Sequence, residues 1–548
     1  MLQVTADKIL INAKIYTMEQ EARAEELAVK DGKILMLGEK GSCTGLIGEE
    51  TEVIDADGKA VLPGFIESHM HPLIYGGSLL ELDCRPDSTS SVEEILNKVR
   101  EAAKETPEGE WILGFGWDES RMIDKRVPTI EELDEAAPHH PVFLKRTDAH
   151  NAVVNSKAFQ ISGIDETKPD PEGGKFAKDK ETGRLTGLIH EDAIKQIKFP
   201  NHSADDLKRG MALAQEDFLK WGLTTVHDKA VSKTEFTVYQ KMLAEGSLKI
   251  RVRMWMWALS QMNWPGIRDH VFGSGLQSGF GNDMVNVQGI KYMLDGAVGG
   301  RTAAVEEPFE GDSENRGILY MAQEKVNEQV MAAVNHNLRI SIHAIGERAI
   351  EQALTAFEAA AEQKPEMASM RNRIEHCVLP VNEHFSRIKQ LGLVAGSSIG
   401  FLYELGDSYA ANLGPERVKR AFPHKSYKKF GIVAPGNSDL PITTGNPFLG
   451  IYAAVNRKTS SGRQLDKSEA ISVYDAVKAF TVDAAYSGYE EDKTGSLKPG
   501  KYADLIILSD DPFTVGEEHL KDIKVELTMM NGDIVYRIPE EEKVNLCS

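Results

Sequence analysis

The hydrophobic pattern of the chain is strand-like at both ends. Near the start, short apolar runs are separated by turn-forming Asp-Gly pairs that begin at Asp31 and Asp57. Such pairs between strand-like runs are typical of hairpins. The last segment repeats this pattern, with an Asn-Gly turn at Asn531. Neither end has enough strands for a stable sheet alone. We therefore predict one small composite β-sandwich, built from residues 1–62 and 487–548.

The middle of the chain alternates strand-like apolar runs with helical patterns. The eight runs are "GFIESHMH", "GLTTVHD", "IRVRMWMW", "VNVQGIKYML", "LRISIHAIG", "RIEHC", "LVAGSSIG" and "IVAPGNSD". Continuous apolar runs are typical of parallel strands that are buried on both faces. The pattern predicts an α/β fold, a (β/α)8 TIM barrel over residues 63–486. Residues 73–204 are too many for one crossover, so we predict an α/β insertion after the first strand.

Polar side chains end most of these predicted strands. His69 and His71 end the first strand and face the same side, because they are two positions apart. Further candidates end the second, fourth, fifth, sixth and eighth strands: His227, Lys291, His343, His376 and Asp439. The His-x-His pair alone is also typical of two hydrogen-bonded histidines. The convergence of imidazoles and a carboxylate at one barrel mouth predicts a metal site. Without thiolates, this set suits zinc, or manganese or iron.

Two of these candidates have more than one interpretation. Lys291 could reach the rim or pair with Asp295, or its amine could have reacted with CO2 to give a carbamate that bridges two metal ions. The residues alone do not decide between these. Asp439, in "PGNSDLP", could stabilise a turn. It could also deprotonate metal-activated water and later protonate the leaving group.

A second group of residues is predicted to line the substrate pocket. Trp117, His150 and Glu191 lie in the predicted insertion. Each taken singly is better explained by a structural role, but as a group they could line the roof of the pocket. Arg301 follows the fourth strand in "GAVGGRTA", where the glycines permit a close approach of the backbone to a ligand. His227 could be a pocket residue or could cap its strand.

The amino-acid composition limits the kinds of molecule that the protein is expected to bind. Acidic residues outnumber basic ones by 84 to 63 in a chain of 548 residues, which argues against nucleic-acid binding. The four cysteines are far apart, so neither a disulfide framework nor a thiolate metal site is expected, and a reducing cytoplasm fits. We find no signal-peptide pattern at the start and no apolar run that could cross a membrane. We expect a small-molecule substrate. A homodimer is left open, since the helix "SSVEEILNKVREAAKE" could be a surface or an interface.

Several motifs together resemble a known family. They are "VLPGFIESHMHP", "GFGWDESR", "DAHNAVVNSKAF", "IKYMLDGAVGGRTA", "ISIHAIGERAI", "RIEHC" and "NSDLPI". With them the chain resembles the amidohydrolase superfamily, and most closely the branch that includes N-substituted formamide deformylases (amidohydrolase family 3). The resemblance implies one or two divalent ions, held by His69, His71, His343, His376 and Asp439, with Lys291 carboxylated. It also implies hydrolysis of an amide-type C–N bond by metal-activated water, with Asp439 as general base and acid.

The chain departs from this family in two places. Relatives usually have Gly-Ser-Asp before the last strand-end aspartate, whereas this chain has "GNSD"; after the seventh strand it has "SSIGF" where many have Gln-Pro. A relative's substrate is therefore not transferred. N-formyl and N-acyl amines are the leading substrates, and a cyclic amide, carbamate or ester is the alternative. A non-catalytic binding or regulatory protein would lack a ligand or the base, and none is missing.

Overall fold

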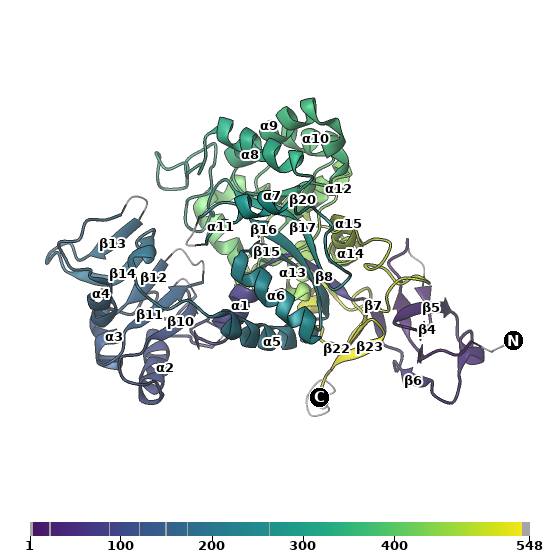
Figure 1. The fold of residues 1–548 in the computed structure, drawn as a ribbon. Helices are drawn as coiled ribbons and strands as arrows, with labels where there is room; N and C mark the ends of the chain where they lie inside the picture. The colour runs from purple at the N-terminus through teal and green to yellow at the C-terminus, as the bar shows by residue number, and fades with distance from the viewer. Residues whose placement is uncertain are drawn as a thin grey trace.

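The computed structural model describes residues 4–20, 23–86, 88–119, 121–147, 151–171, 174–261 and 264–539. Figure 1 shows a central barrel with an α/β insertion on one side and a β-sandwich on the other. This arrangement confirms the predicted fold class. Among the described residues, no helix combines the length and apolar character needed to span a bilayer.

The barrel wall is a parallel sheet of seven strands, in the order β20-β19-β18-β17-β16-β15-β8. Its strands are fully buried along their length, as the continuous apolar runs predict, apart from one half-buried residue in β17. Their bounds are β8 (Phe65–Met70), β15 (Leu223–Val231), β16 (Arg251–Trp257), β17 (Val285–Met293), β18 (Arg339–Ala344), β19 (Arg373–His376) and β20 (Val394–Ser397).

The predicted eighth strand does not form regularly. Residues 432–439 instead lie between β20 and β8 and close the barrel with scattered hydrogen bonds. The Ser397 N–H donates to Pro435 O at 3.1 Å, and the Asp439 N–H donates to His69 O at 2.9 Å. Pro435 has no N–H for a ladder, which explains why this segment makes no continuous pairing.

Helices cover the outside of the barrel (Figure 1). They are α1 (Pro72–Ser78), α5 (Ala204–Lys220), α6 (Lys233–Glu245), α7 (Arg268–Ser274), α8 (Gln323–Asn335), α9 (Glu347–Gln363), α10 (Asn382–Gln390), α11 (Ile399–Lys419), α12 (His424–Phe430), α13 (Pro447–Asn456), α14 (Val473–Ala479) and α15 (Val482–Ser487). Helices α1 and α5 cross at two glycines, Gly76 and Gly210. A Cβ atom on Gly76 would lie 2.6 Å from the Gly210 carbonyl carbon, so only glycine permits this approach.

The insertion has its own mixed sheet, in the order β13-β14-β12-β11-β10-β9, with separate apolar cores. The strands are β9 (Leu82–Asp83), β10 (Ile112–Trp117), β11 (Val142–Arg146), β12 (Asn151–Val154), β13 (Gly174–Lys178) and β14 (Leu185–Glu191). Its helices are α2 (Val92–Glu105), α3 (Ile130–Ala136) and α4 (Ser156–Ser162).

The β-sandwich contains two sheets, ordered β5-β4-β1-β6 and β23-β22-β21-β7-β2-β3. The strands are β1 (Lys8–Ile11), β2 (Lys14–Tyr16), β3 (Arg23–Ala24), β4 (Glu26–Lys30), β5 (Lys33–Gly38), β6 (Glu52–Asp55), β7 (Ala60–Pro63), β21 (Leu505–Leu508), β22 (Val525–Met530) and β23 (Asp533–Arg537). In the second sheet β7 pairs with β21, so both ends of the chain share one sheet.

Candidate metal centre

Two histidines and one aspartate meet at the carboxyl end of β8. His69 lies on β8, and His71 follows it as the residue before α1. The His71 N–H donates to Leu440 O at 2.8 Å, which brings the loop containing Asp439 against β8. Asp439 Oδ1 lies 3.3 Å from His69 Nε2 and 3.0 Å from His71 Nε2. Donor atoms of these three side chains all lie within 4.8 Å of one another, which fits binding of one cation.

Two further imidazoles adjoin this group. The His376 ring, at the end of β19, lies 4.7 Å from the His69 ring and 4.4 Å from the His343 ring, measured between ring centroids. His376 Nδ1 contacts Ser398 Oγ at 2.7 Å, and His343 Nε2 contacts Gly296 O at 3.1 Å. The structure thus brings together all four histidines that the sequence singles out as ligands.

Lys291 on β17 adds a buried amine to this group. Its side-chain nitrogen has no hydrogen-bond partner among the described residues, although the residue is only 3% exposed. Burial lowers the pKa of this amine to about 8, while the nearby carboxylates of Glu375 and Asp439 oppose the shift. An unpartnered buried polar atom is costly, so the position fits a further group attached to or facing the amine. We call the following six residues the candidate metal centre: His69, His71, Lys291, His343, His376 and Asp439.

The electrostatic environment of the candidate metal centre favours the protonation states in which side chains bind a metal ion. Burial lowers the pKa of His69 to about 3, and the charge of Lys291 adds to that shift. The ring is therefore neutral near pH 7 and keeps a lone pair for a metal. Burial alone would raise the pKa of Asp439, but the imidazoles of His69 and His71 hold that pKa below its ordinary value. Asp439 is accordingly an ionised carboxylate that can accept a proton.

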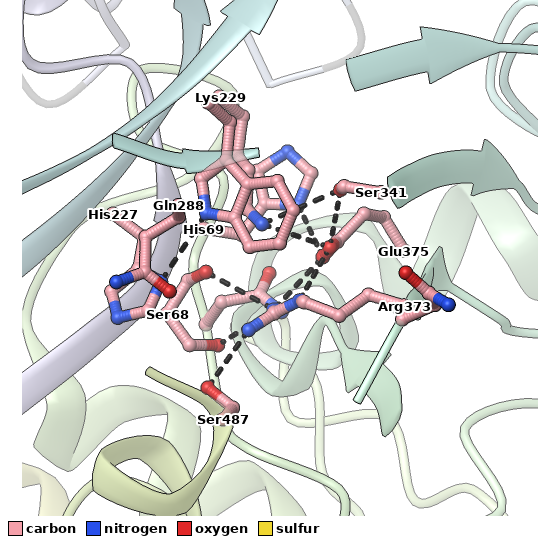
Figure 2. A network of polar contacts seen from close by, with 12 residues as sticks. Ser68, His69, His227, Lys229, Gln288, Ser341, Arg373, Glu375 and Ser487 are labelled. Carbon is pink, nitrogen blue, oxygen red and sulfur yellow. Dashed lines mark hydrogen bonds and ion pairs between the residues drawn. The ribbon is translucent and has the colours of Figure 1, made fainter. Parts of the chain in front are cut away.

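Beneath the candidate metal centre lies a charged network in the barrel interior (Figure 2). Glu375 on β19 accepts hydrogen bonds from Lys229, Ser341 and Arg373 as well as from His69. Neither Glu375 nor Lys229 was assigned a role from the sequence. The sequence contained one signal for Lys229. It lies two positions after His227, and therefore on the same face of a strand that is buried along its whole length.

Two predicted pocket residues lie in or near the loop that follows β17. Arg301, in the loop after β17, donates from Nε to Asn412 Oδ1 on α11 at 2.9 Å. Burial raises the pKa of the Tyr320 hydroxyl, in the loop between β17 and α8, and the charge of Glu191, at the end of β14 of the insertion, adds to that shift. Asp295, near the carboxyl end of β17, acts on the same hydroxyl. Glu191 therefore lies near the loop that follows β17.

Two other predicted pocket residues, Trp117 and His227, are not brought to this group. Trp117 lies in an apolar core of the insertion, and its indole N–H donates to Leu144 O at 2.9 Å. His227 is fully buried; its Nδ1 accepts from the indole N–H of Trp255 at 3.5 Å, and its ring adjoins Gly488. His150 lies outside the described residues.

A barrel of this topology, with imidazoles and a carboxylate gathered at the carboxyl ends of its strands, defines the class of barrel hydrolases with a metal site. The chain belongs to the amidohydrolase family, whose model matches residues 52–536. The protein is therefore an enzyme of the hydrolase class, as the motifs predict.

Individual relatives extend over nearly the whole chain. YtcJ of Bacillus subtilis (strain 168) is 32% identical over 95% of this chain and 98% of its own. The N-substituted formamide deformylase of Arthrobacter pascens is 26% identical over 97% of this chain and 98% of its own. The crystal structure of an uncharacterized metal-dependent hydrolase from Pyrococcus horikoshii OT3 is 29% identical, covers 93% of this chain and 99% of that chain, and superposes with a TM-score of 0.76.

Proposed function

We propose that the protein is a metal-dependent hydrolase that cleaves the C–N bond of an amide, such as an N-formyl or N-acyl amine. The observation that supports this most is the cluster of His69, His71 and Asp439, whose donor atoms lie within 4.8 Å of one another at the barrel mouth. The Arthrobacter pascens relative is named for an N-substituted formamide substrate, and this favours the amide class.

In this proposal each residue of the candidate metal centre has a role. The ligands would be His69, His71, His343, His376 and Asp439, with Lys291 carboxylated as an anionic bridge if two ions bind. Zinc suits these nitrogen and oxygen donors best, and manganese or iron is the alternative. When bound, such an ion is a Lewis acid that acidifies water and polarises a carbonyl.

Asp439 performs the proton transfers in this proposal. As a carboxylate it accepts a proton from the attacking water and then donates this proton to the departing nitrogen. Asp439 Oδ1 lies 3.3 Å from His69 Nε2 and 3.0 Å from His71 Nε2, so the proposed base adjoins the proposed ligands. Arg301 and Glu191 are the proposed substrate contacts.

A substrate screen with metal-loaded protein tests this function. Protein reconstituted with zinc or manganese is assayed against N-formyl amines, N-acyl amines, cyclic amides, carbamates and esters, with release of amine or acid as the readout. We expect turnover of an acyclic amide that a chelator abolishes and added metal restores. Turnover confined to cyclic amides, carbamates or esters would replace the proposed substrate class. Turnover that survives complete removal of metal would contradict the mechanism.

A further inference from the structure

One carboxylate inside the barrel contacts both the candidate metal centre and a buried pair of cations. Glu375 Oε2 accepts from His69 Nδ1 at 2.9 Å and from Arg373 Nη2 at 3.0 Å. Glu375 Oε1 accepts from Arg373 Nε at 2.6 Å, Lys229 Nζ at 2.9 Å and Ser341 Oγ at 2.6 Å. Figure 2 shows these bonds converging on the Glu375 carboxylate. All five side chains are at most 1% exposed.

This arrangement dictates the tautomer of His69. Both oxygens of Glu375 face side chains that can only donate, Arg373 on both and Lys229 on Oε1, so the hydrogen shared with His69 lies on Nδ1 of the ring. A neutral ring then has its lone pair on Nε2, the atom that lies 3.3 Å from Asp439. The hydrogen bond to Glu375 therefore directs the metal-binding nitrogen of His69 toward the other ligands.

The network also fixes the strand that carries His69. Arg373 donates from Nη2 to Ser68 O at 3.1 Å, directly before His69, and from Nη1 to Ser487 Oγ at 2.8 Å. Lys229 approaches from β15 on another side of the barrel interior, with its ammonium 3.6 Å from the centroid of the Trp255 ring. Side chains of β8, β15, β18 and β19 thus hold one carboxylate in place, and Ser487 at the end of α15 holds Arg373.

We propose that Glu375 is a positioning residue, which sets the tautomer and orientation of His69 for metal binding while Lys229, Arg373 and Ser341 hold its carboxylate in place. This inference rests on the proposed function, because it assigns His69 as a ligand. In this proposal Glu375 acts on the metal only through His69. Such outer partners of a metal-bound histidine change metal affinity by about 10- to 100-fold when they are removed.

Zinc affinity tests the proposal independently of catalysis. Glu375→Gln keeps the side-chain size but replaces one acceptor oxygen by an N–H donor. If the remaining oxygen faces Lys229, Arg373 and Ser341, the amide N–H group faces His69 Nδ1 and cannot accept its hydrogen. Zinc dissociation constants of folded wild-type and variant protein are measured by competition with a chromophoric chelator, without any substrate. We expect the affinity of Glu375→Gln to fall by about 10- to 100-fold. The absorption spectrum of the cobalt-loaded protein should also change, because the geometry of one imidazole ligand changes.

Glu490→Gln is the matched control. Glu490, which follows α15, is a buried carboxylate that pairs with Arg253 of β16, but it makes no hydrogen bond to the candidate metal centre among the described residues. Its loss leaves a buried arginine unpaired, as the loss of Glu375 would. We expect zinc affinity within threefold of wild type. Equal losses in both variants, or wild-type affinity in Glu375→Gln, would overturn the positioning role.

A charge-balanced variant covers a failure to fold. Glu375→Gln leaves two cations without their shared anion, which is destabilising in a protein interior. Lys229→Met/Glu375→Gln removes one charge of each sign and must show the same loss of affinity. Ser341→Ala removes one donor and no charge, and we expect its zinc affinity to fall by about two- to fivefold. An unchanged zinc affinity in this variant would contradict the proposal. Wild-type protein that binds zinc without hydrolysing amides would defeat the proposed function and leave this inference intact.

Discussion

Two residues of the candidate metal centre have left-handed backbone conformations. His376 has a φ of 66° and Asp439 a φ of 56°. Such conformations are unfavourable for residues with a Cβ atom and persist where the surroundings enforce them. Here the enforcing contacts include the hydrogen bonds from the Asp439 N–H to His69 O and between His376 Nδ1 and Ser398 Oγ. The two side chains are thus held toward the barrel mouth by the backbone as well as by packing.

Replacing the proposed base should separate binding from chemistry. Asp439→Asn keeps the size of the side chain and one oxygen but cannot accept the proton. We expect the fold to be retained and kcat to fall by about 10²- to 10⁴-fold on the best amide from the screen. Asp283→Asn, at a carboxylate that pairs with Lys493 outside the candidate metal centre, is the control. A wild-type kcat in Asp439→Asn would remove Asp439 from the mechanism.

The amine of Lys291 gives a second residue-level prediction. Lys291→Ala removes the proposed bridging anion, so activity and bound metal should both fall, the latter measured by elemental analysis of the purified protein. Short carboxylic acids such as acetate can occupy the vacated position and should partly restore turnover, whereas equal concentrations of chloride should not. Full activity of Lys291→Ala without added acid would contradict the bridging role.

Local spacing and chain separation determine which site residues the sequence could predict. His69 and His71 were recognisable because a strand places alternate residues on one face. Glu375 and Lys229 were not, because each matters through a partner far away in the sequence: 306 positions separate Glu375 from His69, and 146 separate it from Lys229. A buried charged residue can be recognised from the sequence only when its oppositely charged partner lies close to it along the chain.

At the level of elements, the helix crossing of α1 and α5 links packing to the candidate metal centre. Helix α1 begins directly after His71, so its position sets the position of that imidazole. Gly210→Ala would place a Cβ atom 2.3 Å from Gly76 O and push the helices apart. We expect a loss of about 1–3 kcal/mol in unfolding free energy, seen in urea denaturation, together with weaker zinc binding.

A second helical glycine provides the control for this substitution. Gly273 lies in α7, and a Cβ atom there would meet nothing within 4 Å. Gly273→Ala should therefore leave stability unchanged or raise it, because alanine has the higher helix propensity. If Gly210→Ala were as stable as Gly273→Ala, the close approach of α1 and α5 would not constrain the fold.

The strand pattern predicted the barrel but not the manner of its closure. Seven of the eight apolar runs form regular strands, and the eighth, "IVAPGNSD", closes the barrel irregularly. Its apolar start resembles a strand, while its proline and turn residues favour the loop that presents Asp439. Periodicity thus located the segment, and the missing proline N–H decided its conformation.

At the level of the whole molecule, a buried ion pair joins the barrel to the sandwich. Arg251 at the start of β16 pairs with Asp504, which directly precedes β21; both are at most 4% exposed. Asp504 Oδ1 also accepts from the Asn531 N–H at 2.9 Å. Asp504→Ala would leave a buried guanidinium unpaired. We expect a loss of about 3–5 kcal/mol in chemical denaturation.

An exposed aspartate of the same sandwich is the control for that variant. Asp533 is 83% exposed in its side chain and lies 3.9 Å from Lys8. Asp533→Ala should leave the denaturation midpoint unchanged, as surface ion pairs contribute little. A midpoint for Asp504→Ala equal to that of Asp533→Ala would show that the two domains do not depend on this pair.

The pairing of β7 with β21 has a consequence for biosynthesis. About 440 residues separate Pro63 from Leu505, yet they are direct neighbours across the sheet. At roughly 5–20 residues per second, β7 emerges from the ribosome roughly 20 to 90 s before its partner is translated. Throughout that interval one edge of β7 in the nascent polypeptide is unpaired, and an unpaired strand edge promotes aggregation. A stalled or prematurely terminated translation event would leave that edge permanently exposed, however well the barrel had formed.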